Sequence, residues 1–345
     1  MKNSLDKTCC AESGSPSGSP PTPVGLHRFA IVTSAATFML IFVGGLVTST
    51  GSALAVPDWP LSFGKFFPKM QGGVLYEHGH RMIAGVVAIM TLVLMVWALM
   101  RERSALVRYV AVAAFGLVIV QAVLGGLTVL LLLPLPIAVA HAATAQAFFC
   151  LTVAFCLFTG SRWRDAVPIS PVERARPALP LLAAITTAAI FGEILIGAVM
   201  RHMGAGLAIP DFPLAFGRIV PPLESTFIAV NFAHRCGALA VATLVVWTVA
   251  RVLRFYRNEP ALRRPAISLL LLLVAQISLG AVTIWSGREV VPTTAHVAVG
   301  AGVLATSLIL TLRAYHLLAV GVRARSPQEL PIFAASKRVE REVTA

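Results

Sequence analysis

Residues 51–68 read GSALAVPDWPLSFGKFFP, and residues 204–221 read GAGLAIPDFPLAFGRIVP. The two stretches align without gaps at an offset of 153 residues, and ten of their eighteen positions are identical. Self-similarity at a fixed separation is the sequence signature of a repeated structural unit. The match therefore predicts that the chain contains one unit in two copies.

Three shorter matches extend this repeat at nearly the same offset. They are His80-Arg81 with His234-Arg235, Gln121 to Gly125 with Gln276 to Gly280, and Ala140-His141 with Ala295-His296. The repeat therefore extends over most of the chain, well beyond the two loops in which it is clearest.

The composition is that of a membrane protein. Of the 345 residues, 57% are hydrophobic and 12% are charged, about half the charge of an average soluble domain. Apolar runs are long enough to cross a bilayer, which takes about 20 residues as a helix. We predict eight spans, at residues 29–48, 82–100, 106–131, 137–159, 179–200, 233–251, 266–286 and 293–317.

The distribution of positive charge predicts how these spans are oriented. Arginine is concentrated in the segments 101–108, 162–176 and 251–264 and in the C-terminal tail. Cytoplasmic loops carry an excess of Lys and Arg. Both termini are therefore predicted to be cytoplasmic, in the cytoplasmic (inner) membrane of a bacterium. The formal net charge of +13 is then a signal of topology, and nucleic-acid binding is excluded as an interpretation.

The predicted fold class is an all-α membrane protein with eight transmembrane helices, arranged as two tandem, parallel-repeat four-helix bundles. Each copy holds an even number of spans, so both copies enter the membrane in the same direction. We divide the chain into a disordered cytoplasmic tail, a first bundle, a cytoplasmic linker, a second bundle and a second cytoplasmic tail. Their boundaries are 1–26, 27–165, 166–178, 179–320 and 321–345.

Four of the eight histidines form two repeat-matched pairs near the outer ends of the spans. Ionisable residues at such depths are costly and usually functional. Because imidazoles from facing helices suit axial ligation of haem iron, we predict that His80 and His141 form one haem site and that His234 and His296 form another. The remaining histidines are interpreted as loop or interfacial residues: His27, His78, His202 and His316.

The residues beside the first histidine of each pair suggest further roles. Arg81 and Arg235 follow these histidines, and a guanidinium group suits pairing with haem propionates. Glu77 precedes His80 by three residues on the same helical face, whereas Asn231 occupies the matching place. Because an amide cannot transfer a proton, we predict a reactive site with catalytic Glu77 in the first copy and an electron-transfer site in the second. The matched loop residues Asp58 and Asp211 are expected to organise the loops.

Taken in order, these motifs resemble the haem A synthase family. The resemblance rests on the loop start GGLVTSTGS, the WPL turn, EHGHR at 77–81 and His141, and in the second copy on VMRH at 199–202, the PL turn, His234-Arg235 and His296. It implies oxidation of the ring-D methyl group of haem O to a formyl group, which yields haem A for cytochrome oxidase. It also implies that His80 and His141 hold the substrate haem, that Glu77 handles protons, and that His234 and His296 hold haem b.

The resemblance implies partners as well, and there is one departure from the family pattern. An electron donor is required, and a complex with the haem O-forming farnesyltransferase and a homo-oligomer are both compatible with it. Many family members carry cysteines in the outer loops, where this chain has Val56, Ser62, Ile209 and Ala215. Thiol chemistry in these loops therefore cannot be transferred to this chain.

Three other interpretations stay open at the level of sequence. A b-type di-haem electron carrier would use the same histidines without oxidising a substrate, but it gives no reason for Glu77. A transporter would explain parallel repeats, although no pair of spans is broken by Gly or Pro at mid-membrane. A copper or zinc site would have only two histidines and one glutamate, which is a thin ligand set.

Overall fold

The computed structural model describes residues 23–173 and 175–323. Eight helices in this part of the chain are long and apolar enough to cross a membrane, so the predicted all-helical, multi-pass architecture is confirmed. With the short α5 (Ser161–Arg164), they make up the α-helices of the described chain. They are α1 (Val24–Ser49), α2 (Gly73–Arg101), α3 (Ala105–Leu130), α4 (Leu135–Thr159), α6 (Leu179–His202), α7 (Thr226–Phe255), α8 (Pro260–Trp285) and α9 (Val290–Arg323).

Local sequence explains where several helices begin. Ser104 and Ser225 stand directly before α3 and α7, and their hydroxyl groups accept hydrogen bonds from the backbone N–H groups of Val107 and Ile228. Such caps satisfy amide groups that lack a partner within the helix. Proline lies in the first turn of α4, α6 and α8, where its missing N–H costs nothing.

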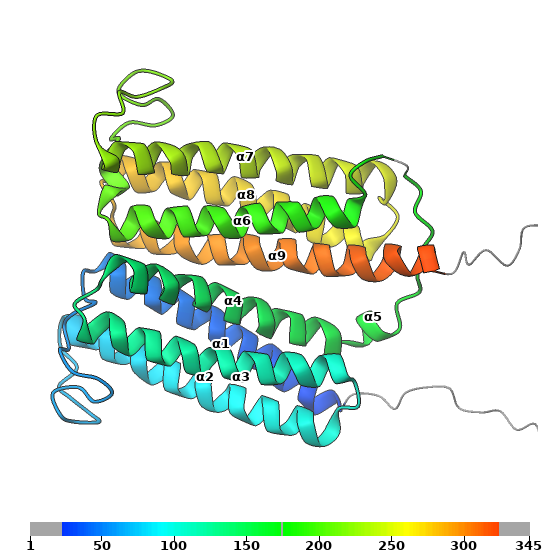
Figure 1. The fold of residues 1–345 in the computed structure, drawn as a ribbon, viewed down its shortest axis with the longest axis horizontal. Coiled ribbons are helices and arrows are strands. Elements are labelled where there is room, and N and C mark those ends of the chain that lie inside the picture. Colours follow the sequence, from blue (N-terminus) through cyan, green and yellow to red (C-terminus); the bar gives the residue numbers. More distant parts are fainter. Residues whose placement is uncertain (1–22, 174, 324–345) are drawn as a thin grey trace, which may run out of the picture.

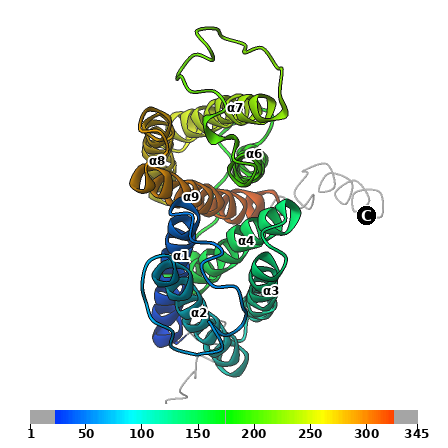
Figure 2. The same cartoon turned by 90° about the vertical axis from the view of Figure 1, so that its left-hand side faces the viewer.

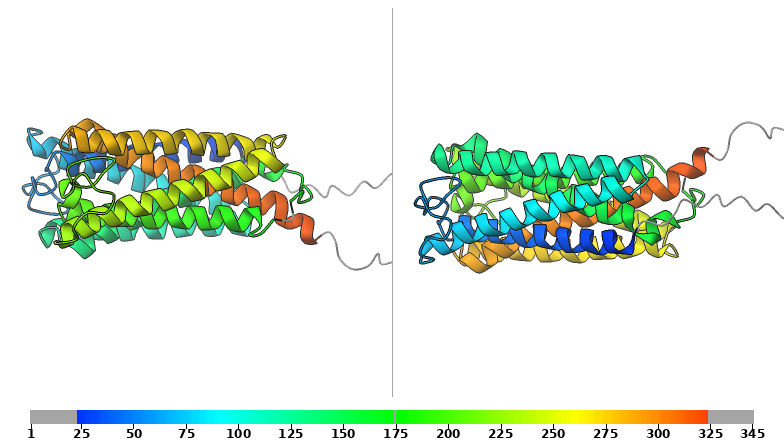
Figure 3. Two further views of the ribbon diagram at one scale, coloured as in Figure 1. Left: turned by 90° about the horizontal axis from the view of Figure 1, so that it is seen from above. Right: turned by 90° about the horizontal axis from the view of Figure 1, so that it is seen from below.

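The eight long helices lie in two groups of four (Figures 1 and 2). In the first group α1 contacts α2 and α4, and α3 contacts α2 and α4. In the second group α6 contacts α7 and α9, and α8 contacts α7 and α9. The helices run side by side along the long axis of the molecule (Figure 3). Each group is therefore closed upon itself, with every helix touching two neighbours of its own group.

The two groups meet through α1 and α4 on one side and α6 and α9 on the other. One polar contact across this interface involves Arg201, whose Nη2 donates to the carbonyl oxygen of Gly45 and to Oγ of Ser49, both at 2.8 Å. Thr294 of α9 also donates to Ser49, at 3.0 Å. Near one end of the molecule, residues of the second group are thus tied to the last turns of α1.

The two repeated loops have the same conformation, at the same end of the molecule (Figure 1). Asp58 accepts hydrogen bonds from the backbone N–H groups of Phe63 and Gly64 at 2.7 and 2.8 Å. Asp211 accepts the matching bonds from residues 216 and 217 at 2.8 and 2.9 Å. These donors hold the pKa of each carboxyl group below its ordinary value. The expectation that the two aspartates organise the loops is confirmed.

The predicted starts of two spans were wrong by about two helical turns. The second and sixth spans were placed from residues 82 and 233, but α2 begins at Gly73 and α7 at Thr226. Hydropathy alone ends a span where polar side chains begin, whereas here the helix continues because those side chains are paired with the loop. As a result, His80 and His234 lie well inside their helices.

At the other end of the molecule, α1 begins at Val24 and α9 reaches Arg323, so both helices extend a few residues into the predicted tails. The predicted disorder of residues 1–22 and 324–345 falls outside the described residues.

Candidate functional site

All four predicted ligand histidines lie at the end of the molecule that carries the repeated loops. His141 and His296 follow the first residues of their helices, Leu135 and Val290, by six positions. His80 and His234 follow Gly73 and Thr226 by seven and eight positions. At 1.5 Å per residue, every histidine is about 9–12 Å from the start of its helix. The four imidazoles therefore lie at similar depth.

Each of these imidazoles faces a glycine on the neighbouring helix. A Cβ atom at Gly44 would stand 3.1 Å from Nε2 of His80, and one at Gly125 would stand 3.1 Å from Cε1 of His141. In the second group, a Cβ at position 197 would be 3.0 Å from His234, and one at position 280 would be 3.2 Å from His296. The four glycines are related by the repeat. They give each imidazole space that any other residue would fill.

The histidines of each predicted pair lie on diagonally opposite helices of their group, His80 and His141 on α2 and α4 and His234 and His296 on α7 and α9. A repeated glutamine lies beside the second histidine of each pair. The side-chain nitrogen of Gln121 is 3.4 Å from Nε2 of His141, and the corresponding distance from Gln276 to His296 is 3.3 Å. The sites in the two groups are therefore built to one plan.

The Nδ1 atoms distinguish the two pairs. Nδ1 of His296 is 3.1 Å from the backbone carbonyl oxygen of Gln276, and Nδ1 of His234 is 2.6 Å from a carboxylate oxygen of Glu193. An acceptor at Nδ1 places the proton there and leaves Nε2 free to bind a metal. Among the described residues, neither His80 nor His141 has a hydrogen-bond acceptor at Nδ1. The second pair thus has an oxygen atom beside each Nδ1, a hydrogen-bonded carbonyl group at His296 and a close carboxylate, without hydrogen-bond alignment, at His234.

Glu77 and Arg81 form a buried clamp on the first loop. Arg81 Nη2 is 2.6 Å from Glu77 Oε1, and the backbone N–H of Val56 donates to Oε2 at 2.8 Å. Arg81 Nη1 also donates to the carbonyl oxygens of Asp58 and Leu61, at 2.7 and 2.8 Å. Only 6% of the Glu77 side chain is exposed. These contacts fix the loop between α1 and α2 to the first turns of α2, the part of the helix that also holds His80.

The second loop has an equivalent clamp without the carboxylate. Arg235 Nε donates to the side-chain oxygen of Asn231 at 3.0 Å, and its Nη1 and Nη2 donate to the carbonyl oxygens of Leu214 and Ile209. The amide nitrogen of Asn231 donates to the carbonyl oxygen of Ala205 at 2.9 Å. Here the neutral amide of Asn231 takes the place of the Glu77 carboxylate, so the arginine has a neutral partner.

These contacts add a structural role to the two arginines. Arg81 and Arg235 were predicted to bind haem propionates, and that stays a prediction. In the structure their guanidinium groups donate to loop carbonyl groups at repeat-matched positions.

The other four histidines lie in varied surroundings. His27 pairs with Thr159, and His316 stacks on Trp163 with ring centroids 4.0 Å apart; both contacts are at the end opposite the loops. His78 is buried, and its Nδ1 is 2.8 Å from Oγ of Ser62. His202 is the last residue of α6.

Sequence reasoning missed Glu193 in this region, and it assigned no role to Arg201, although that residue lies in the VMRH motif. Glu193 lies within the apolar span α6, and Arg201 near the end of the same helix. The repeat could have exposed both, because Leu40 and Thr48 occupy the matching positions of α1. At each of these aligned positions the second copy has a charged residue and the first copy has an uncharged one. Such a position marks a difference between the two copies.

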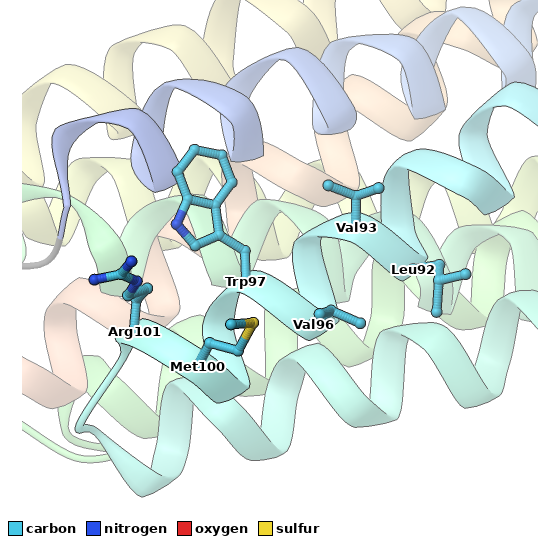
Figure 4. Close-up of a pocket in the computed structure, with 6 residues that line it drawn as sticks. All are labelled: Leu92, Val93, Val96, Trp97, Met100 and Arg101. Carbon is cyan, nitrogen blue, oxygen red and sulfur yellow. The ribbon is translucent and has the colours of Figure 1, made fainter.

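A surface pocket on α2 is not part of this site. It is lined by six residues near the end of the helix that is remote from His80 (Figure 4): Leu92, Val93, Val96, Trp97, Met100 and Arg101. Apart from Arg101 its lining is apolar, and it holds none of the predicted site residues.

Fold and site together define a class, a multi-pass helical membrane protein with two repeat-matched pairs of histidines near the end of the molecule that carries the repeated loops. Residues 74–308 match the family described as cytochrome oxidase assembly protein. The chain belongs to this family.

Relatives include a heme A synthase of Symbiobacterium thermophilum, which is 29% identical over 264 residues, covering 74% of this chain and 84% of the relative. The heme A synthase of Geobacillus kaustophilus is 28% identical over 305 residues, covering 84% and 92% of the two chains. The one from Shouchella clausii is 28% identical over 267 residues, covering 74% and 85%.

Proposed function

We propose that this protein is a haem A synthase, an oxidoreductase that converts the ring-D methyl group of haem O into the formyl group of haem A. The observation that carries the proposal is a pair of similar imidazole sites with different polar surroundings. Glu77 stands beside His80 in one site, while Glu193 stands beside His234 in the other. An enzyme that oxidises one haem with the help of a second needs two such inequivalent sites.

His80 and His141 are assigned to the iron of the substrate haem, and His234 and His296 to the iron of haem b. The glycines opposite all four imidazoles and the oxygen atoms beside Nδ1 of His234 and His296 support this assignment. Bound haem b would supply one-electron transfer. A substrate that must enter and leave suits the first pair, because no carboxylate is paired with either of its imidazoles in the described structure.

Glu77 is assigned to proton handling at the first site. Its two carboxylate oxygens are held by Arg81 and by the backbone of Val56, on the helical face that also carries His80. A carboxylate held in this way can take up or release a proton at a fixed place beside the substrate. Asn231 cannot do this at the second site.

The two helix groups are interpreted as tandem copies of one four-helix bundle in parallel orientation. The repeated loops at one end of the molecule and the matched clamps of Arg81 and Arg235 support this interpretation. By the distribution of arginine, the loops and all four histidines lie toward the outer face of a bacterial inner membrane, with both termini in the cytoplasm.

The proposal is tested by extracting the haems of the purified, full-length protein from cells that supply haem O. Chromatography and mass spectrometry would identify them in the wild type, in Glu77→Gln and in a control, Glu224→Gln. Glu224 is exposed in the second outer loop, so its substitution should change nothing. We expect haem A with haem b in the wild type and the control, and haem O or a hydroxylated intermediate in Glu77→Gln.

Haem b alone in all three proteins, with haem O left unbound, would contradict the proposal. It would favour a b-type electron carrier that uses the same histidines. Haem A at wild-type yield in Glu77→Gln would leave the synthase assignment in place but remove the catalytic role of Glu77.

A further inference from the structure

Glu193 is a carboxylate inside an apolar span whose sole described polar neighbour is a predicted iron ligand. Its Oε1 lies 2.6 Å from Nδ1 of His234. Both carboxylate oxygens and this nitrogen are shielded from solvent, and none of the three has an aligned hydrogen-bond partner among the described residues, so the contact is a close pairing of buried polar groups. An ionisable group at such a position is expensive to keep in a membrane and is rarely there without a function.

The space for this carboxylate is made by a second difference between the two copies. The side chain of Glu193 lies against Gly237, at the place where a Cβ atom would be. In the first copy, Leu40 occupies the position of Glu193 and Ile83 that of Gly237. Leu40 and Ile83 pack against the same apolar cluster. Two apolar side chains in one bundle are thus replaced together by a carboxylate and a glycine in the other.

Among the four predicted ligands, His234 alone has a carboxylate as its described neighbour at Nδ1. His296 has a neutral acceptor there, the backbone carbonyl group of Gln276. A charge-assisted hydrogen bond is roughly twice as strong as a neutral one. A carboxylate behind a ligating histidine fixes its tautomer and orientation and raises the basicity of the nitrogen that binds the metal.

We propose that Glu193 is a positioning residue for His234: it accepts the Nδ1–H, directs Nε2 toward the iron of haem b, and lowers the reduction potential of that haem. A stronger donor stabilises ferric iron more than ferrous iron, so the potential falls. In the first copy Leu40 occupies the position of Glu193. An iron held there would therefore not have its reduction potential lowered by a carboxylate. The inference rests on the proposed function, because it takes His234 as an iron ligand.

The test compares the wild type with Glu193→Gln, Glu193→Leu and the double variant Glu193→Leu/Gly237→Ile, each as the full-length protein purified with its haems. The readouts are haem b content, the midpoint potential from a redox titration, and the low-spin ferric spectrum by electron paramagnetic resonance. The double variant reproduces the packing of the first copy without restoring the acceptor. It therefore separates the hydrogen bond from the filling of space.

We expect Glu193→Leu to raise the midpoint potential. A tenfold weaker preference for ferric iron corresponds to a rise of about 59 mV for a one-electron couple. Glu193→Gln should give a smaller rise, because its amide oxygen still accepts the bond but carries no charge. The double variant should keep the full rise, and the ferric signal should shift toward that of a weaker axial donor in the same order.

The possible outcomes are distinguishable. If the wild type carries no haem b, or if His234→Ala retains it in full, the assignment of His234 as a ligand fails and the proposed function with it. If haem b is present but the potential is unchanged in Glu193→Gln and Glu193→Leu, the inference about Glu193 alone is overturned. A rise that disappears in the double variant overturns it as well, since packing would then be the cause. Should Glu193→Leu bind no haem, the potential of Glu193→Gln decides.

Discussion

The two helix groups agree in their loops and differ in the polar groups around their histidines. Asp58 and Asp211 accept hydrogen bonds from backbone amides at matching positions of the two loops. Arg81 and Arg235 likewise donate to carbonyl groups at matching positions. Beneath these loops, however, each copy has one glutamate where the other has an uncharged residue. The pairs are Glu77 with Asn231 and Glu193 with Leu40.

The location of this difference is informative. Glu77 lies near the start of α2, where it contacts the first repeated loop. Glu193 lies further from the end of its helix, beside His234. Under the proposed function, the first carboxylate is placed to handle protons and the second to act on an iron ligand. The two repeated segments thus share their loop contacts, while a few substitutions in the interior give their histidines different polar neighbours.

The largest expected effect comes from removing one ligand of each pair. His234→Ala should remove haem b from the purified protein, because one axial ligand is lost. His80→Ala should retain haem b but form no haem A. The measurement is the haem content of both variants by extraction and chromatography. His27→Ala, at the opposite end of the molecule, is the control and should retain both haems. Loss of haem b in His80→Ala would show that the two sites are not separate.

A large effect on stability is expected from the arginine clamps, and it should be unequal. Arg81→Ala leaves the buried carboxylate of Glu77 without its cation, and breaking a buried pair costs about 3–5 kcal/mol. Arg235→Ala leaves only a neutral amide and carbonyl groups, at about 1–3 kcal/mol. The midpoint of thermal unfolding in detergent should therefore fall further in Arg81→Ala.

The double variant Arg81→Ala/Glu77→Gln sharpens this comparison. With the unpaired charge removed, its unfolding midpoint should return close to that of Arg235→Ala. Equal midpoints for Arg81→Ala and Arg235→Ala would mean that the charge on Glu77 contributes little to holding the loop.

The sequence allowed much of this to be predicted, because two signals were strong. Long apolar runs set the eight spans, and repeat-matched histidines selected four candidates out of eight. The starts of α2 and α7 could not be read from hydropathy, since Glu77, His80 and Arg81 are polar yet helical. Their pairing with the loop, which permits this, is a tertiary contact. Glu193 could have been noticed from the repeat, which has Leu40 at the matching position, but its contact with His234 could not be predicted because the two residues are on different helices.

A smaller effect is expected at the glycines that face the histidines. Gly197→Ala would place a Cβ 3.0 Å from Cε1 of His234, so the ring must shift. Affinity for haem b should fall by about tenfold, because changes around a metal ligand that alter its orientation typically cost at least this much. The matched control is Gly192→Ala in the same helix, where a Cβ would meet no atom within 4 Å. Titration of the protein, stripped of haem, with haem b would measure both.

The smallest effect is expected at the loop aspartates. The folded protein lowers the pKa of Asp58, chiefly through the N–H groups of Gly64 and Phe63. Its stabilising contribution is therefore present above the pKa of the unfolded chain and is lost as the pH falls through the lowered value. Asp58→Asn removes this pH dependence from the first loop. Hydrogen exchange of residues 51–72, corrected for the intrinsic rate at each pH, would follow it.

At neutral pH, Asp58→Asn should exchange faster than the wild type by roughly fivefold or less, because exposed charged contacts contribute little. Residues 204–221 serve as the internal control, since Asp211 holds them by the same bonds and is unchanged. On acidification, exchange in the wild-type first loop should approach that of Asp58→Asn, while the variant stays constant. Faster exchange in both loops would mean that the loops are coupled, and the two copies could then not be treated as independent scaffolds.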